Sequence, residues 1–436
     1  MIRKLALVSL SAMALSMSGQ TETLQEALDL AFQTNPALEA QRADIGVARE
    51  QLNQARGARA PTVDLSASAG YESLDSNQPI AFNVGDRPVA TAQLQATLPV
   101  YTGGRINAGI EQAQAGILAA NAQFDGAAQD LILNVVTAYV DVLRDRQALR
   151  IRANSVALLE EQLRAATDRF EVGFATRTDV KQAEARVEGA RAAVAGAQAQ
   201  LEASLSIYEL FVGQEAGDLI AVGDGPGIPE SYESALQTAL AENPDLKALR
   251  QAETAAAQAV RSARGETRPS LSIVGTASAQ ETFDIEATAI SPTMGVITLP
   301  PDNYRDTSLS LFARGTVPLF QGGVLNSRIR AAKLEREQAR LQTINAERQI
   351  TASVAQAWYG NIAAEQAITA SERQVEAAEI AYEGSQEELS VGTRTTLDVL
   401  DQEQQLLEAR LGLVDAERDA YVAAHQLLRA MGQLSF

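Results

Sequence analysis

The chain has 436 residues, of which only 5% are aromatic, and it carries a formal net charge of −19. Phosphate binding requires a basic face, so this charge argues against nucleic acid as a partner. Few aromatic residues and long stretches without Gly or Pro favour long helices packed through small side chains over ordinary globular domains. The chain contains no Cys, which excludes disulfides, thiolate chemistry and an acylated N-terminal Cys.

The N-terminus is typical of a secretory signal. Arg3 and Lys4 precede an apolar run from Leu5 to about Leu15, and small residues follow around Ser16. This run is too short to span a bilayer as a helix, and no other stretch approaches the ~18 apolar residues required. We therefore expect an exported protein without a lipid anchor, which enters a membrane, if at all, as strands.

The rest of the chain is a duplication. Asn35-Pro36 recurs 208 residues later as Asn243-Pro244, and Pro99 recurs 219 residues later as Pro318. The separation is constant within each block and changes only between Pro61 and Pro99, which marks one surface loop of variable length in each half. The expected organisation is a signal at 1–20, a first half at 21–214, a linker at 215–230 and a second half at 231–436.

Each half opens with two helices separated by Asn-Pro, where Asn caps the second helix and Pro takes its first position. The second helix ends before Pro61 or Pro269, and the sequence period changes there from near 3.6 to 2. Runs of about ten residues then alternate apolar and polar side chains, as in tilted transmembrane strands with one wet face. A small soluble sheet is the other interpretation of this alternation. The predicted strands cover about 61–71, 89–99, 269–280 and 306–318, and the loops at about 72–88 and 280–304 are expected to face the cell exterior.

The longest predicted element follows the second strand of each half. From about Asn107 to Phe170 there is no Pro, and the apolar residues keep a heptad repeat with one four-residue step. About 64 helical residues make a rod of roughly 95 Å. Val172-Gly173 and Val391-Gly392 end the two rods, and Asp179 and Asp398 are expected to start the returning helices of two hairpins, with tips at about 172–179 and 391–398. The returning helices are shorter, so we expect the helix before each strand to stack on them end to end.

Four strands cannot close a sheet in lipid, because an open edge leaves backbone groups unpaired and known single-chain barrels start at about eight strands. A barrel must therefore be shared between copies. The number of strands is compatible with both a dimer, which would have eight strands, and a trimer, which would have twelve. The Ser, Thr, Gln and Gly residues of the inward face favour the wider, wet lumen of the larger assembly.

These features together resemble the TolC family of outer-membrane efflux and secretion channels. The resemblance covers the whole mature chain, and its most specific part is the second tip, Val391-Gly392-Thr393-Arg394-Thr395-Thr396-Leu397-Asp398-Val399-Leu400-Asp401. It implies a mainly α fold with a transmembrane β-barrel portion, shared in a homotrimer as a twelve-stranded barrel in outer-membrane lipid and continued by a coiled-coil tunnel in the periplasm. The implied function is the passive exit duct of a tripartite efflux or type I secretion system. The implied partners are a periplasmic adaptor (membrane fusion protein) and an inner-membrane ABC or RND-type pump.

The resemblance also implies a gate at the periplasmic tips, closed by polar links between neighbouring hairpins and by rings of Asp. Leu389 stands where the family often has Tyr, which puts one link in doubt. Plain helix capping is an alternative role for the aspartates at the helix starts, and a solvated charge is the alternative for Arg394 and Asp401. The carried-over roles are Arg394 reaching Thr178 and Asp179, Asp398 and Asp401 in the rings, and Gly173 and Gly392 in contact with the adaptor.

We expect neither an enzyme nor a cofactor or metal. The single His, His425, has no nearby nucleophile, and the sequence shows no metal-ligand cluster, phosphate loop or nucleophile elbow. The Gly pairs after the strands lack the third Gly of a dinucleotide fingerprint. The alternative function is a soluble periplasmic coiled-coil adaptor, although such a protein usually has one hairpin and an inner-membrane anchor. The residues expected to turn each strand into its helix are Pro99, Gly103, Gly104, Pro318, Gly322 and Gly323.

Overall fold

The computed structural model describes residues 21–73, 87–223, 225–285, 288–291, 295–298 and 302–435. The predicted signal at 1–20 and most of the predicted loop at 72–88 lie outside the described residues. The chain forms two compact units, and both halves of the sequence contribute to each. The first unit contains the described residues within 1–42, 122–247 and 345–436, and the second contains those within 43–121 and 248–344.

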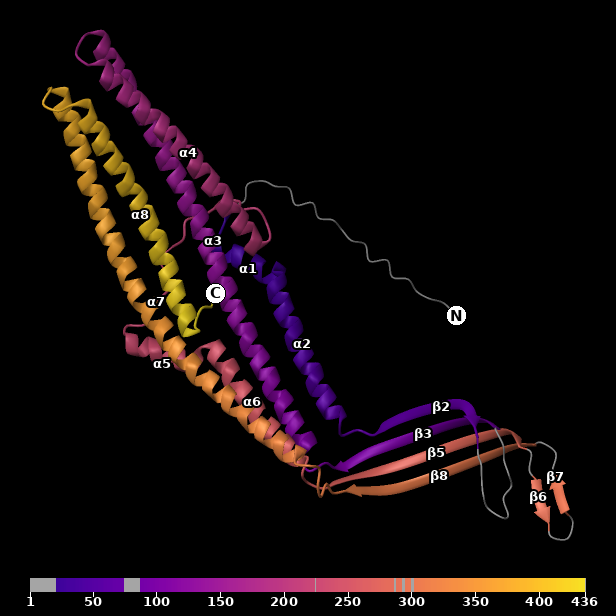
Figure 1. The fold of residues 1–436 in the computed structure, drawn as a ribbon. Helices are drawn as coiled ribbons and strands as arrows, with labels where there is room; N and C mark the ends of the chain where they lie inside the picture. The colour runs from indigo at the N-terminus through magenta and orange to yellow at the C-terminus, as the bar shows by residue number, and fades with distance from the viewer. Residues whose placement is uncertain are drawn as a thin grey trace. The chain divides into compact units, whose positions relative to one another are not determined.

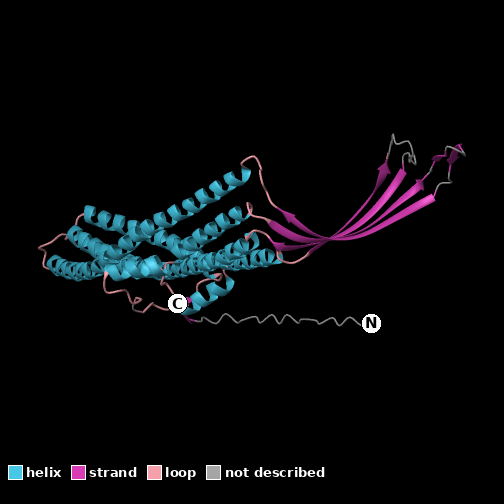
Figure 2. Ribbon diagram, turned by 90° about the horizontal axis from the view of Figure 1, so that it is seen from below, coloured by secondary structure: helices cyan, strands magenta, loops and turns pink. Residues whose placement is uncertain are grey.

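The second unit holds an antiparallel sheet with the strand order β2-β3-β5-β8 (Figures 1 and 2). A short hairpin of β6 and β7 lies between β5 and β8 in the chain. The sequence predicted a loop from about 280 to 304, but both flanking strands extend into that range. The strands are β2 (Thr62–Glu72), β3 (Arg87–Tyr101), β5 (Ser270–Ile285), β6 (Thr288–Ser291), β7 (Gly295–Thr298) and β8 (Asp302–Thr316).

The strand register places the four alternating runs on common faces. Leu94 pairs with Leu65 on one side and with Ala277 on the other, and Ala277 pairs with Leu309. Paired residues of antiparallel strands point to the same side, so these side chains form one apolar row. The next row, on the opposite face, is Ser66, Gln93, Ser278 and Ser308. Leu309 is 86% exposed, and a continuous exposed apolar face of this kind marks a membrane or protein contact.

Two adjacent glycines connect the last strand of each half, β3 or β8, to a long helix. Gly103 and Gly104 have φ angles of 65° and 90°, and they lie between β3 and α3 (Arg105–Glu171). Gly322 and Gly323 have φ angles of 58° and 83° before α7 (Val324–Ser390). The two prolines are placed differently from each other. Pro318 lies in the connection between β8 and α7, as predicted. Pro99 lies inside β3, where the register with β5 shifts, and so it is not part of the turn.

The helices of the first unit meet end to end through the two Asn-Pro motifs. Asn35 Oδ1 accepts hydrogen bonds from the backbone amides of Ala37 and Leu38, at 3.0 and 3.3 Å, and so caps α2 (Pro36–Gly57). Its Nδ2 donates to the Phe211 carbonyl at the end of α4 (Arg177–Val212). Asn243 repeats the arrangement between α6 (Pro244–Gly265) and α8 (Thr396–Met431). The predicted end-to-end stacking is therefore confirmed at these junctions.

The first described residues are fixed to the linker between the halves. β1 (Thr21–Glu22) pairs in parallel with β4 (Asp218–Leu219). The hydroxyl of buried Tyr208 donates to the Glu22 carboxylate at 2.6 Å. The hydroxyl of Tyr139, also buried, lies 2.8 Å from the Glu22 carbonyl in β1 and 2.7 Å from the Ile220 carbonyl just after β4, and can donate to either. Strands of two residues are too short to give a periodicity, so the sequence did not predict this pairing. The helices α1 (Leu24–Thr34) and α5 (Tyr232–Glu242) then open the two halves.

The expectation that no second apolar stretch approaches a membrane-spanning length is wrong for one helix. Among the described residues, α3 alone contains a window that is long and apolar enough to cross a bilayer. Half of that window is buried inside the protein, as in the core helix of a packed bundle.

The turn after β3 provides a test of the close packing in the second unit. A Cβ atom on Gly103 would lie 2.4 Å from the Gly265 carbonyl oxygen, whereas a Cβ on Gly104 would meet nothing closer than 3.8 Å. Both residues have positive φ, which costs a non-Gly residue about 1–2 kcal/mol. Gly103→Ala adds an overpacking cost of about 1–3 kcal/mol. In thermal unfolding in detergent, Gly103→Ala should therefore unfold at a clearly lower temperature than Gly104→Ala; equal shifts would contradict the close approach.

Candidate functional site at the helical hairpin tips

The first unit ends in two helical hairpins, α3–α4 and α7–α8 (Figure 1). Each tip turns at a glycine with positive φ, Gly173 at 84° and Gly392 at 79°. Their amides donate to the carbonyls of Phe170 and Leu389, which closes the last turn of each outgoing helix. The same local chemistry therefore builds both tips.

A capping box starts each returning helix, and it corrects the predicted helix starts. Thr176 Oγ1 accepts from the Asp179 amide at 3.2 Å, and the Asp179 carboxylate accepts from the Thr176 amide and hydroxyl at 2.7 and 2.9 Å. Thr395 and Asp398 repeat the box. The threonines are thus the N-caps, and the two aspartates occupy the third helical position. Their side chains are engaged in reciprocal capping.

The capping box also sets the charge of Asp398. Hydrogen bonds from the Thr395 hydroxyl and amide, with Arg394 nearby, hold the pKa of the Asp398 carboxyl below its usual range. The helix N-terminus further favours the anion. The Asp398 carboxyl therefore remains an anion at neutral pH.

Arg394 is bound within its own tip. Its Nε donates to the Glu388 carboxylate of α7, and the guanidinium makes no hydrogen bond to Thr178 or Asp179 of the same chain. Thr178 is exposed in the first turn of α4. The predicted link from Arg394 to the first tip is thus not a contact within one chain. The sequence missed Glu388, because a pair that bridges a turn six residues apart follows no helical spacing.

Two polar contacts from one turn of α8 join the second hairpin to the first. Asp401 pairs with Arg186 of α4 at 2.7 Å. Glu403, only 4% exposed, accepts a hydrogen bond from the Ser155 hydroxyl of α3. Burial raises the pKa of Glu403, and the Ser155 hydroxyl opposes that shift. α8 therefore makes a polar contact with each helix of the first hairpin.

Glu403 was not among the predicted site residues, although the sequence carried a signal for it. It lies between Leu400 and Leu406, both buried on the stripe that α8 packs inward. A carboxylate within an apolar stripe requires a buried partner. The stripe does not identify that partner, because Ser155 lies 248 residues away in the chain.

Apolar packing occupies the place of the polar link that the family often has. Leu389 packs against a cluster of Tyr382, Val399 and Leu406, with Leu158 of α3 at its edge. Leu400 enters a second cluster, which contains residues of α3 and α4. The contacts between the hairpins near the tips of one chain are therefore mainly apolar, with the Arg186–Asp401 and Ser155–Glu403 pairs added.

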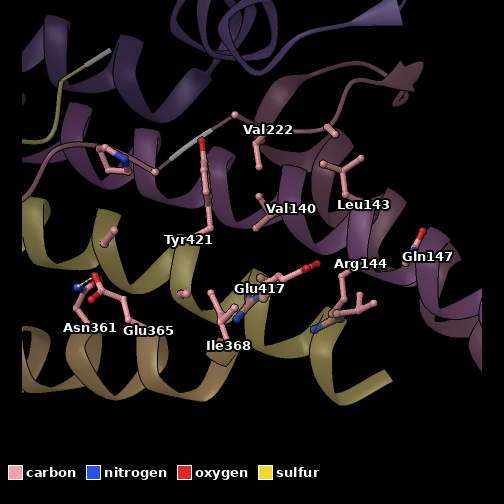
Figure 3. Close-up of a pocket in the computed structure, with 18 of the residues that line it drawn as sticks. Val140, Leu143, Arg144, Gln147, Val222, Asn361, Glu365, Ile368, Glu417 and Tyr421 are labelled. Atoms are coloured by element: carbon pink, nitrogen blue, oxygen red, sulfur yellow. Dashed lines mark hydrogen bonds between the residues drawn. The ribbon is translucent and has the colours of Figure 1, made fainter. Parts of the chain in front are cut away.

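A cavity of about 750 Å³ lies elsewhere in the first unit, between α3, α7, α8 and the linker (Figure 3). Its polar side chains include residues that pair locally, Arg144 with Asp145 at 2.8 Å and Asn361 with Glu365 at 2.9 Å. His425 lies beneath Tyr421, with Nδ1 2.7 Å from the Tyr421 carbonyl, and burial lowers its pKa. The described residues contain no group of His, Cys, Asp and Glu that could hold a metal.

The chain is similar to known outer-membrane proteins. The model of the family described as outer membrane efflux protein matches residues 27–210 and 235–433. The chain is 29% identical to the outer membrane efflux protein BepC of Brucella suis, over 95% of this chain and 86% of the relative. It is 26% identical to the outer membrane protein TolC of Escherichia coli, over 98% and 86%. The solved Campylobacter jejuni CmeC outer membrane channel superposes with a TM-score of 0.78 at 18% identity, over 94% and 86%.

The buried carboxylate on α8 gives a test with a defined pH dependence. Because the pKa of Glu403 is raised in the folded state, the folded protein gains stability relative to the unfolded chain as the pH falls through that value. Glu403→Gln removes the buried charge and still accepts from Ser155, so it should unfold at an equal or higher temperature than the parent at neutral pH. This advantage should shrink on acidification. Glu403→Ala leaves Ser155 unpaired and should cost about 1–3 kcal/mol; equal losses in both variants would contradict a buried, hydrogen-bonded carboxylate at this position.

Proposed function

The chain belongs to the outer membrane efflux protein family and is an outer-membrane exit duct for efflux or secretion, and we propose that three copies build each duct. In this proposal the sheets of the copies join into one barrel, and the long helices form a tunnel below it. The family match does not support the alternative of a soluble periplasmic adaptor. The observation that carries the proposal is the sheet, which has an apolar face and two free edges.

The free edges explain why assembly is needed. β2 and β8 are the outer strands of the four-stranded sheet, so half of the backbone groups of each lack a strand partner. In lipid an unpaired backbone group costs several kcal/mol. Two copies supply eight strands, whose interior is filled by side chains, whereas three supply twelve and leave a lumen. The rows of Ser, Thr and Gln on the inner face fit a lumen.

The duplication also supports a specific interface between copies. Within one chain β3 of the first half pairs with β5 of the second half, and Leu94 lies opposite Ala277. Ala313 in β8 lies 219 residues after Leu94, and Ala69 in β2 lies 208 residues before Ala277. Repeating the contact between copies therefore puts Ala313 of one copy opposite Ala69 of its neighbour. The same repetition converts the contact of Gly103 with Gly265 into a contact of Gly322 with Gly57 of the neighbour. Both Gly57 and Gly322 have open space around them in the single chain.

Cysteine pairs test this register, because the chain has no Cys of its own. The double variant Ala69→Cys, Ala313→Cys should form a disulfide between copies under mild oxidation and give a covalent ladder on denaturing gels. Ser68→Cys with Ala313→Cys is the matched control, since residue 68 points to the opposite face of the sheet. Cross-linking of the control pair alone would show that the proposed register is wrong.

We place the periplasmic entrance at the hairpin tips. Threefold repetition of Asp179, Asp398 and Asp401 collects carboxylates near one axis, where they repel one another. Arg394 offsets part of this repulsion when it leaves Glu388 and reaches Thr178 and Asp179 of the adjoining copy. Asp401 contributes less charge than its position suggests, because Arg186 neutralises it within the chain.

The exposed side chains of the tips suit an adaptor partner. Val172 is 68% exposed, Phe174 is 86% exposed and Val391 is 74% exposed, beside the glycines of the two turns. Apolar groups at the end of a long coiled coil are the kind of surface that a periplasmic adaptor covers. The adaptor in turn connects the duct to an inner-membrane ABC or RND-type pump.

Single-channel recording tests the gate. Arg394→Glu should raise conductance, because it replaces the cation of the link by a further anion, and Glu388→Gln should not, because it leaves Arg394 available for the neighbouring tip. Asp398→Asn should reduce cation selectivity more than Asp401→Asn, whose charge is paired with Arg186. If Arg394→Glu conducts like the parent while the assembly stays intact, the tips are not the gate.

A further inference from the structure

The chain is acidic overall, but the junctions between its sheet and its helices are basic. Four segments, 56–59, 99–111, 261–268 and 317–330, contain eight Arg and two Glu and neither Asp nor Lys, in a chain with a net charge of −19. We call these arginines the basic belt. All of them are exposed, and they are Arg56, Arg59, Arg105, Arg261, Arg264, Arg268, Arg328 and Arg330.

Contacts between the junctions make the belt continuous within the second unit. Arg59 donates to Asn107 at 2.7 Å, which joins the end of α2 to the start of α3. Arg268 donates to the Gly103 carbonyl at 3.3 Å, which joins the end of α6 to the turn after β3. Arg328 pairs with Glu266 at 2.8 Å, which joins the start of α7 to α6. The four junctions thus lie side by side at one end of the sheet (Figure 1).

Most of the positive charge of the belt is not balanced. Arg261 pairs with Glu111 at 3.1 Å, and Arg328 pairs with Glu266, which uses both glutamates of the four segments. The remaining arginines make either no ion pair with described residues or hydrogen bonds to neutral acceptors only. Six positive charges of the belt are therefore without an ion-pair partner among the described residues of the chain.

Helix electrostatics explain only part of the belt. Arg56 and Arg264 lie in the last turns of α2 and α6, where the helix dipole favours a cation. The arginines near the starts of α3 and α7 have no such explanation. α3 and α7 begin at the belt without an acidic residue in the first turn, and α3 begins with Arg105 itself. The other six helices each carry an acidic residue there. A cation at a helix N-terminus opposes the helix dipole by about 0.3–1 kcal/mol. An interaction outside the chain is the simplest reason to place arginines there.

The belt borders the side chains that mark a membrane surface. Tyr101 at the end of β3 is 48% exposed, and Leu319 and Phe320 after β8 are 92% and 88% exposed. Tyr101 pairs with Leu271, which lies on the apolar face of the sheet. Amphipathic aromatic residues are enriched where the hydrocarbon core meets the headgroups. The arginines follow within a few residues, on the helical side.

We propose that the basic belt binds the phosphate headgroups of anionic phospholipids in the periplasmic leaflet of the outer membrane. The inference rests on the outer-membrane location, with the helices on the periplasmic side. Arg presents a planar fork of donors that matches phosphate, and the apolar strands hold the belt at the depth of the headgroups. The belt thereby fixes the depth of the duct in the membrane, against the repulsion between an acidic protein and an anionic surface.

Native mass spectrometry tests the proposal on the whole assembly. The protein is released from nanodiscs made of equal parts of phosphatidylglycerol and phosphatidylcholine. The number of molecules of each lipid that remain bound is then measured. The parent should retain phosphatidylglycerol preferentially, and added salt should weaken the preference through screening. Each Arg near an anionic surface contributes about fivefold in affinity. The triple variant Arg56→Gln, Arg264→Gln, Arg330→Gln should therefore lose roughly tenfold or more of the preference.

A matched variant controls for the change in net charge. This control variant removes three exposed helical arginines outside the belt, through Arg164→Gln, Arg348→Gln and Arg373→Gln. It should keep the parent's preference for phosphatidylglycerol. If the parent inserts and conducts but retains both lipids alike, the belt proposal is wrong while the function as a duct stands. If the belt variant keeps its lipid preference and shifts the reversal potential, the arginines line the lumen, which also overturns the proposal. Failure to insert into either lipid would contradict the function itself.

Discussion

The pairing of backbone groups at the edges of a four-stranded sheet is the constraint on which the rest of the structure depends. An edge strand in hydrocarbon leaves amides and carbonyls without partners, and this chain has two such edges, on β2 and β8. In the proposed assembly the apolar face of the sheet places those edges in lipid, and adjoining copies pair with them. The helices take part in the same proposal, because each pair of strands continues through a glycine turn into a long helix.

The duplication suggests how such copies would meet. Within one chain the first half contacts the second, for example where Gly103 approaches Gly265. In the proposed assembly the second half of one copy meets the first half of the next through the equivalent surface. The strict repeat spacing is then a requirement of the interface, since an insertion in one half would break a contact in both places. In the sequence, the repeat spacing changes only between Pro61 and Pro99 and in the equivalent segment of the second half.

Short-range sequence patterns predicted most of the helices and strands. They did not predict which side chains far apart in the sequence would pair. Alternation located the strands, and Asn35 and Asn243 marked helix junctions because a cap acts on its immediate neighbours. The tips were less predictable. Thr176 and Thr395 cap the helices in place of the aspartates, since a reciprocal box shifts the start by three residues. Arg394 binds Glu388 of its own tip. The buried Glu403 was visible as an anomaly in an apolar stripe, but its partner Ser155 follows from tertiary packing alone.

Electron cryomicroscopy of the assembly in nanodiscs tests most directly whether identical neighbours complete a sheet that no single chain can close. We expect three copies around one axis, with β8 of each copy beside β2 of the next and one continuous sheet enclosing a lumen. A map in which β2 and β8 of the same chain pair with each other, or in which either edge faces lipid without a partner strand, would contradict this expectation.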